Sequence, residues 1–183
     1  MTPLANVPTL VLIGPSGAGK TTLIARLLAT RPHGETWAVL ANDRGAVRIS
    51  PCDGVSVAEV GGGCVCCTAQ VALRVALTRL LREARPARLL VELDAASHTS
   101  AALKTLRDPW LASIVAIDAV IGVFSGDEHR AGGAVPAGLA ACDVVCVRGD
   151  FAAFASLAAG KRMLEASRAT LAALQGMSVS DPR

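Results

Sequence analysis

Short apolar runs alternate along this chain with segments of helical period. The apolar runs predict strands at residues 9–13, 37–41, 55–60, 88–93, 111–120 and 143–147. The segments between them predict helices at residues 20–30, 68–84 and 98–106, with one or two more within 151–174. The apolar runs contain few polar residues, which is typical of parallel strands buried on both faces. The pattern therefore predicts an α/β fold in three layers, a mostly parallel sheet with helices on both faces.

Composition agrees with one globular domain over residues 1–183. Apolar residues make up 52% of the chain and charged residues 18%, which excludes a disordered protein. Residues 125–138 are rich in glycine and charge and are expected to form a surface loop. No repeat or change of composition indicates a second domain.

Charge and hydropathy bear on location and partners. The longest apolar stretch, residues 110–124, contains Asp118 and is shorter than the roughly 20 residues that cross a bilayer. The N-terminus lacks the basic region of a signal peptide, so we expect a cytoplasmic protein without a membrane partner. The net charge of +3, without a long basic run, gives no support to nucleic-acid binding.

A glycine-rich loop follows the first predicted strand. Its sequence GPSGAGKT matches G-x-x-x-x-G-K-[ST] between a strand and a helix, the pattern of a phosphate-binding loop. Glycines let the backbone N–H groups face the phosphates, Lys20 can reach the β- and γ-phosphates, and the Thr21 hydroxyl can ligate Mg²⁺. The predicted nucleotide-binding residues of this loop and helix start are Gly14, Ser16, Gly17, Ala18, Gly19, Lys20, Thr21 and Thr22.

The loop alone leaves the class of nucleotide-binding protein open among GTPases, small-molecule kinases and transport ATPases. The helix-start motif LSGGQ of ABC-type ATPases is absent from the sequence, which excludes that type. Glu92, at the end of an apolar strand, is the expected acid of the Mg²⁺ shell, and Asp94 is the alternative if that strand is longer.

Three cysteines lie within four residues, in the sequence GGCVCC. Cys64, Cys66 and Cys67 can converge on one ion, and a helix that starts just after them would lower their pKa values. Three thiolates suit Zn²⁺ or Cu(I) better than Mg²⁺, so the cluster predicts a site for a thiophilic metal. The three remaining cysteines are expected to be buried as small apolar side chains: Cys52, Cys142 and Cys146.

With a phosphate loop and, about 45 residues later, a G-C-x-C-C motif, the chain resembles the CobW-type metal-handling GTPases, relatives of UreG and HypB. The resemblance extends from about residue 8 to residue 150. It implies a P-loop NTPase fold with Ras-like strand order, and GTP hydrolysis that serves the delivery of metals such as zinc or cobalt. We also expect the chain to lack the C-terminal domain that many members carry.

The resemblance assigns roles to further residues. Asn42 to Gly45 is similar to the first switch loop, in which Asp43 would join the cysteines as a metal ligand. Glu92 matches the Mg²⁺-shell acid, and Ile117-Asp118-Ala119 is similar to a motif at a strand end. Arg148 and Asp150 match the residues that read guanine.

The chain departs from the family pattern at two positions that bear on activity. Val147 replaces the asparagine of the guanine-reading motif, so we expect a weakened preference for guanine. Ala95 replaces a switch glycine, which predicts slow hydrolysis.

These features predict a GTP-binding metal-handling protein, a slow GTPase with Lys20, Thr21 and Glu92 at its catalytic centre. Its cofactors would be GTP and Mg²⁺, its cargo Zn²⁺ or another thiophilic metal at the cysteine cluster, and its partner a client metalloprotein. The alternatives are a small-molecule kinase and a degenerate regulatory module that binds nucleotide without hydrolysing it.

Overall fold

A computed structural model describes residues 6–42, 48–60, 67–94, 99–128, 134–158 and 160–175. Seven strands form one sheet in the order β3-β2-β4-β1-β5-β6-β7, and every described pair of neighbours is parallel. The strands are β1 (Val7–Gly14), β2 (Trp37–Asn42), β3 (Val55–Glu59), β4 (Arg88–Asp94), β5 (Val115–Ser125), β6 (Val144–Arg148) and β7 (Arg162–Glu165). The α-helices are α1 (Lys20–Ala29), α2 (Cys67–Ala84), α3 (Thr99–Leu106), α4 (Pro109–Ala112), α5 (Phe151–Ala155) and α6 (Leu171–Gln175). Short 3₁₀ turns are η1 (Gly126–Glu128), η2 (Leu139–Ala141) and η3 (Ala166–Arg168).

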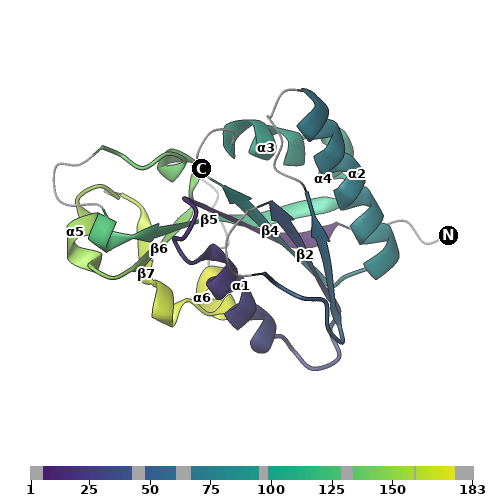
Figure 1. The fold of residues 1–183 in the computed structure, drawn as a ribbon, viewed down its shortest axis with the longest axis horizontal. Coiled ribbons are helices and arrows are strands. Elements are labelled where there is room, and N and C mark those ends of the chain that lie inside the picture. Colours follow the sequence, from purple (N-terminus) through teal and green to yellow (C-terminus); the bar gives the residue numbers. More distant parts are fainter. Residues whose placement is uncertain are drawn as a thin grey trace, which may run out of the picture.

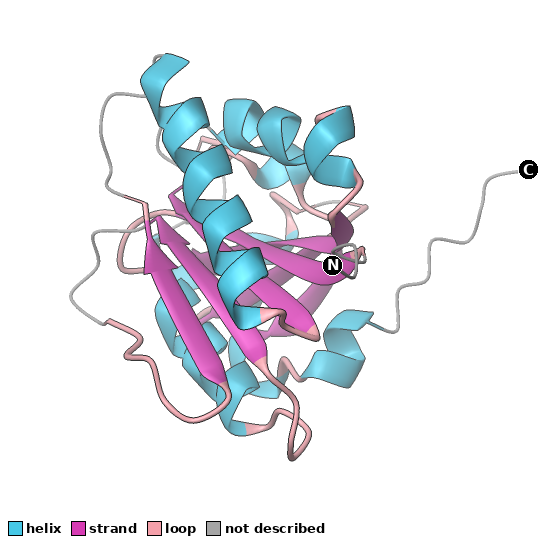
Figure 2. Ribbon diagram, turned by 90° about the vertical axis from the view of Figure 1, so that its right-hand side faces the viewer, coloured by secondary structure: helices cyan, strands magenta, loops and turns pink. Residues whose placement is uncertain are grey.

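Helices cover both faces of the sheet (Figures 1 and 2). Along the central strand β1, Val11 and Ile13 join one apolar core with α2 and α3, while Leu10 and Leu12 join the other with α1 and α6. This division follows from the alternation of side chains along a strand, and it explains why the strand is apolar throughout. The expected fold class, a three-layer α/β fold with Ras-like strand order, is confirmed, with β3 as the outermost strand beside β2.

The fifth strand corrects one prediction. Residues 111–120 were expected to form a strand with Asp118 near its end, but β5 begins at Val115 and continues to Ser125. Asp118 lies in the first half of β5, beside a register shift against β1, and its Oδ2 accepts a hydrogen bond from Arg88 Nη1 at 3.1 Å. The Arg88 guanidinium also lies over the buried ring of Trp37. The resemblance of Ile117-Asp118-Ala119 to a strand end is therefore wrong.

Two further expectations change toward the C-terminus. Residues 151–174 were expected to be helical, but β7 interrupts them and extends the sheet beside β6. The loop expected at residues 125–138 begins one residue later, because Ser125 completes β5 and the turn η1 follows it directly. None of the helices in the described ranges is long and apolar enough to cross a membrane.

Parallel pairing brings the carboxyl ends of the strands to one edge of the sheet. Gly14 of β1 is paired with Asp94 of β4, and Ser125 of β5 is paired with Arg148 of β6. In open parallel sheets, ligands bind outside these carboxyl ends. Among the described residues, the phosphate loop follows this edge, and Glu92, Arg148 and Asp150 lie near it.

Candidate functional site

The loop after β1 has the backbone conformation that its glycines were expected to allow. Gly17 and Gly19 have φ values of 80° and 101°, and Gly19 directly precedes the first residue of α1. A side chain at Gly14 would place its Cβ 2.1 Å from the Val123 carbonyl oxygen of β5. Glycine at position 14 is thus required by the close approach of β5, in addition to any approach of a phosphate.

Lys20 lies at the centre of this loop and is 2% exposed. Its Nζ donates hydrogen bonds to the carbonyl oxygens of Gly14, at 3.0 Å, and Pro15, at 2.9 Å. An ammonium ion held in this way at a helix N-terminus is suited to bind an anion, because the helix dipole and the charge act in the same direction. Of the other predicted nucleotide-binding residues, Ala18 is buried, whereas Ser16, Gly17 and Thr22 are exposed.

A buried hydroxyl–carboxylate pair joins α1 to β4. Thr21 Oγ1 donates a hydrogen bond of 2.6 Å to Oε1 of Glu92, a carboxylate that is 1% exposed. Hydroxyl and carboxylate oxygens are the ligand type that Mg²⁺ prefers, so this donor set fits the expected ion. Thr21 is the last residue of the phosphate-loop motif, so its hydroxyl lies where a metal bound to the phosphates needs a ligand.

β4 contains both acidic candidates and runs on to Asp94, which is the case in which the sequence left Asp94 as the alternative. Glu92 contacts Thr21, whereas Asp94 is the last residue of the strand, is half-buried and lies opposite Gly14. Both side chains lie on the same face of the strand, because they are two positions apart. The direct bond to Thr21 supports Glu92 as the expected metal-shell acid.

The turn after β6 carries the two predicted base-reading residues. Arg148 ends β6 with an exposed side chain, and Gly149 follows with a φ of 78°. Asp150 is the N-cap of α5, since its Oδ1 accepts a hydrogen bond of 2.9 Å from the Ala153 N–H. Val147, at the asparagine position of the resembling motif, is 2% exposed and belongs to the core.

Two residues that sequence analysis assigned to a loop hold this turn. Asp127 Oδ1 accepts a hydrogen bond of 3.1 Å from the Asp150 N–H, and its carboxylate lies against Gly149. Gly126 packs so closely on Asp150 that a Cβ would lie 1.9 Å from its carbonyl oxygen. The sequence Ser-Gly-Asp at residues 125–127, after a long apolar run, could have indicated these two residues, but it lies beyond the predicted strand end at residue 120.

The cysteine cluster and the first switch lie mostly outside the described residues. This applies to Asp43, Cys64, Cys66 and the switch residue Ala95, and the side chain of Cys67, the first residue of α2, is not described either. Their nearest described neighbours adjoin one another, because Ala41 of β2 is paired with Glu59 of β3 and its carbonyl oxygen accepts a 2.9 Å bond from the Val60 N–H.

The other cysteines divide into two groups. Cys142 and Cys146 are buried as expected, and burial raises the pKa of each thiol to about 12. The expectation for Cys52 is wrong, because it lies exposed in the turn that precedes β3. Within the described ranges, no three His, Cys, Asp or Glu side chains are grouped so that they could hold a metal ion.

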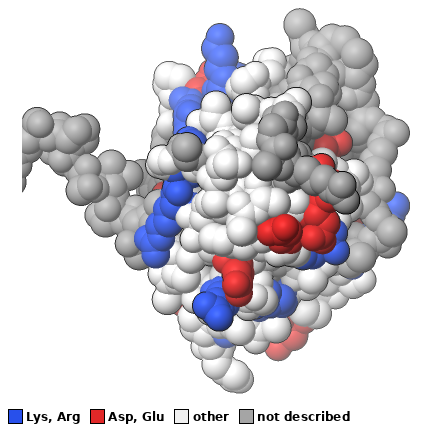
Figure 3. All heavy atoms as spheres, turned by 90° about the vertical axis from the view of Figure 1, so that its left-hand side faces the viewer, with Lys and Arg blue, Asp and Glu red and all other residues white. Residues whose placement is uncertain are grey.

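Acidic and basic side chains mix on the face that carries α5 and β7 (Figure 3). Acidic groups occupy the middle of the visible described surface, with basic groups around them. A nucleic-acid backbone requires a continuous basic surface, which this view does not show in the described atoms.

Comparison with curated proteins finds relatives that are named as zinc chaperones. The chain is 38% identical over 111 residues to "Zinc chaperone YeiR" of Escherichia coli, a match that covers 56% of this chain and 34% of that protein. It is 28% identical over 138 residues to "Zinc chaperone CobW" of a Sinorhizobium species, covering 69% of this chain and 39% of that protein. The chain therefore spans little more than a third of the length of these relatives.

Solved structures share the fold. A Zn(II)-bound triple mutant of the YjiA GTPase matches with a TM-score of 0.61 at 19% identity, covering 97% of this chain and 66% of that one. The hydrogenase maturation factor HypB from Archaeoglobus fulgidus matches with a TM-score of 0.50 at 14% identity, covering 91% and 83% of the two chains.

The family model for the CobW/HypB/UreG nucleotide-binding domain matches residues 8–169, which is most of the chain. This chain therefore belongs to the CobW/HypB/UreG family of nucleotide-binding domains.

Proposed function

We propose that this protein is a metal-handling GTPase that binds Mg²⁺·GTP at the loop after β1 and carries a thiophilic metal, such as Zn²⁺, as its cargo. The family assignment and the names of its zinc-chaperone relatives support this function. The observation that carries the proposal is the adjacency of strand ends at one sheet edge. The strands that lead to the phosphate loop, the first switch and the cysteine motif are all parallel and end there.

At the nucleotide, Lys20 gives the phosphates a fixed cation, and the backbone N–H groups of the loop and of α1 supply further donors. Thr21 and Glu92 would hold Mg²⁺, which neutralises phosphate charge when bound. The bond of 2.6 Å between them keeps both oxygens oriented in the resting protein. These residues therefore need little rearrangement to receive the ion, which lowers the cost of binding.

At the base, Asp150 accepts from guanine while the stem of Arg148 lies along the ring. Oδ1 of Asp150 caps α5, and among the described contacts its second oxygen, Oδ2, has no donor. Because Val147 is packed in the core, it contributes no hydrogen bond to the base. The resulting preference for GTP over ATP is modest.

At the cargo site, Cys64, Cys66 and Cys67 supply the thiolates, and Asp43 supplies a fourth ligand. Asp43 directly follows β2 and Cys64 follows β3 after a few residues, and these two strands pair along their length. A switch loop that responds to Mg²⁺·GTP would move one ligand of this site. Binding at each site then changes the affinity of the other by the same factor.

The test is a zinc competition titration of reduced protein, with and without Mg²⁺ and a nonhydrolysable GTP analogue. We expect one tightly bound equivalent, an affinity that depends on nucleotide, and its loss in a Cys66→Ser/Cys67→Ser variant. Affinity should fall at lower pH as protons compete for the thiolates. A Cys52→Ser variant is the matched control, because Cys52 is an exposed cysteine outside the motif.

Four results separate the alternatives. Equal zinc binding by the double variant and the wild type would rule out the cargo site. Zinc binding that ignores nucleotide would rule out only the coupling. Phosphate release from GTP, measured beside a Lys20→Ala variant, distinguishes a slow GTPase from a nonhydrolysing module. A small-molecule kinase would instead transfer the phosphate to an added acceptor.

A further inference from the structure

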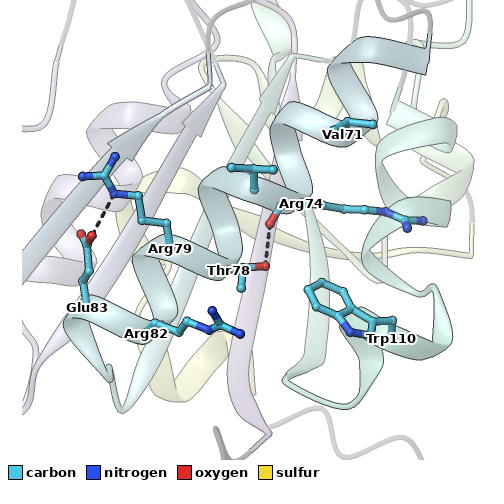
Figure 4. A pocket seen from close by; sticks show the side chains of 8 residues that line it. Val71, Arg74, Thr78, Arg79, Arg82, Glu83 and Trp110 are labelled. Atoms are coloured by element: carbon cyan, nitrogen blue, oxygen red, sulfur yellow. Dashed lines mark hydrogen bonds and ion pairs between the residues drawn. The ribbon is translucent and has the colours of Figure 1, made fainter.

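A groove of about 690 Å³ lies between the outer face of α2 and the helix α4 (Figure 4). Its volume is within the range of ligand pockets in proteins, roughly 300–1,000 Å³. The groove is formed by described residues of two helices that pack on the same face of the sheet. It does not involve the phosphate loop or the residues of the proposed metal site.

The apolar part of the groove consists of three exposed side chains. Val71 and Val75 are each 61% exposed and lie one turn apart on α2, while Trp110 of α4 is 53% exposed. The chain has only two tryptophans, and the other, Trp37, is completely buried. Exposed apolar groups that cluster in this way are typical of interaction sites, and tryptophan is among the residues that contribute most to binding energy.

The groove is held in shape before any partner binds. Arg74 Nη2 of α2 and Asp108 Oδ2 form an ion pair of 3.0 Å, and Oδ1 of the same carboxylate accepts from the Trp110 N–H at 3.1 Å. Asp108 thus caps α4 and ties it to α2. Trp110 is fixed at its backbone, so a partner would pay less entropy to order this side of the site.

The polar part of the groove is mainly basic. Three arginines line it, and two of them are already ion-paired, Arg79 with Glu83 at 2.8 Å and Arg74 with Asp108, so that Arg82 is the one without a carboxylate partner among the described contacts. Arg82 extends toward the Trp110 ring in the close view (Figure 4). The ligand that complements this surface has an apolar stripe for the valines and tryptophan, and carboxylates for Arg82.

We propose that this groove docks an acidic amphipathic helix of a partner protein. Its apolar positions would lie against Val71, Val75 and Trp110, and its flanking carboxylates would face Arg82. An amphipathic helix in an apolar groove is a recurrent mode of peptide recognition. A second copy of this chain fits less well, because its groove would supply no carboxylate for Arg82, since Glu83 and Asp108 are already paired. A nucleic-acid backbone fits less well too, since neither the apolar valines nor the acidic Glu83 can bind its phosphates.

The test uses the full chain and three labelled helical peptides of about five turns that share one leucine stripe. Their polar positions are all Glu, all Gln or all Lys. In fluorescence anisotropy titrations at low salt, we expect the Glu peptide to bind about tenfold more tightly than the Gln peptide, and the Lys peptide most weakly. The advantage should shrink at high salt because of screening. Acrylamide quenching of Trp110 should fall in the complex, while Trp37 is already buried.

Variants locate the binding surface. Arg82→Glu should remove the preference for the Glu peptide, and Trp110→Ala should weaken binding of all three peptides. Val135→Ser is the matched control, since this valine is 66% exposed but does not line the groove, and it should bind as the wild type does.

Four results would overturn the proposal. The first is that the Glu peptide binds no better than the Gln peptide. The second is that its binding is unchanged in both Arg82→Glu and Trp110→Ala. The third is that a duplex oligonucleotide competes with the peptide for the groove. Finally, sedimentation could show a dimer that Trp110→Ala dissociates, which would assign the groove to self-association.

Discussion

Replacement of Glu92 by Gln tests the proposed magnesium site. The substitution keeps the shape of the side chain and leaves an oxygen that can accept from Thr21, but it removes the negative charge. Glu92 is 1% exposed and its Oε1 is 2.6 Å from the Thr21 hydroxyl, so the charge lies in a place where water screens little. We expect the affinity for Mg²⁺·GTP to fall.

The size of this loss follows from the type of contact. A hydrogen bond to a charged group contributes about 1.5–3 kcal/mol, roughly twice the value of a neutral one. If the variant loses an interaction of this size with the metal, affinity falls about ten- to a hundredfold. Asp94→Asn is the matched control on the same strand, and we expect a change of less than about threefold there, because half-exposed charges are screened.

The assay is a titration with a fluorescent GTP analogue, in excess Mg²⁺ and again in EDTA. The Glu92 variant should lose affinity only in Mg²⁺, since Lys20 and the loop backbone contact the phosphates in both conditions. Circular dichroism and the melting temperature establish that each variant is folded.

Two outcomes would refute this reasoning. If Asp94→Asn loses Mg²⁺-dependent binding and the Glu92 variant does not, the acid of the site is Asp94. If both variants bind as the wild type does, the Thr21–Glu92 pair is a structural contact and the metal is held elsewhere.

Three further predictions follow from the geometry of the sheet edge and the cysteines. Gly14→Ala forces its Cβ against a backbone carbonyl of β5, so we expect a loss of about 3 kcal/mol, or about 6 to 12 °C in melting temperature by calorimetry. Asp127→Ala removes the acceptor that holds the turn after β6, and competition of ATP against GTP should show a smaller guanine preference at unchanged Mg²⁺ dependence. Cys52 should react with iodoacetamide at pH 8, whereas burial raises the pKa of Cys142 and Cys146 to about 12, so peptide mapping should find these two unmodified until the protein unfolds.

Local rules succeeded where a short segment determines its own structure. The phosphate loop was identifiable because glycines, a lysine and a hydroxyl at fixed spacing have few other uses between a strand and a helix. The parallel sheet followed from strands that are apolar on both sides, although β4 ends at Asp94, two positions beyond the predicted acid Glu92.

Predictions failed where a distant residue decides the outcome. The family resemblance placed Asp118 at a strand end, but β5 continues past it, and Arg88, thirty residues earlier in sequence, supplies the partner that a carboxylate inside a sheet requires. The segment of β7 is too short for its pattern to distinguish a strand from a helical turn, and pairing with β6 decided the matter.

The sequence by itself thus determined the fold class, the phosphate loop with Lys20 and Thr21, and the family to which the chain belongs. The tertiary structure alone decided that Thr21 bonds to Glu92 across 71 positions of sequence, and that Asp127 holds the turn of Asp150. The physical reason is that chain spacing fixes contacts only within a loop or helix, whereas contacts between strand ends depend on the order in which strands pair.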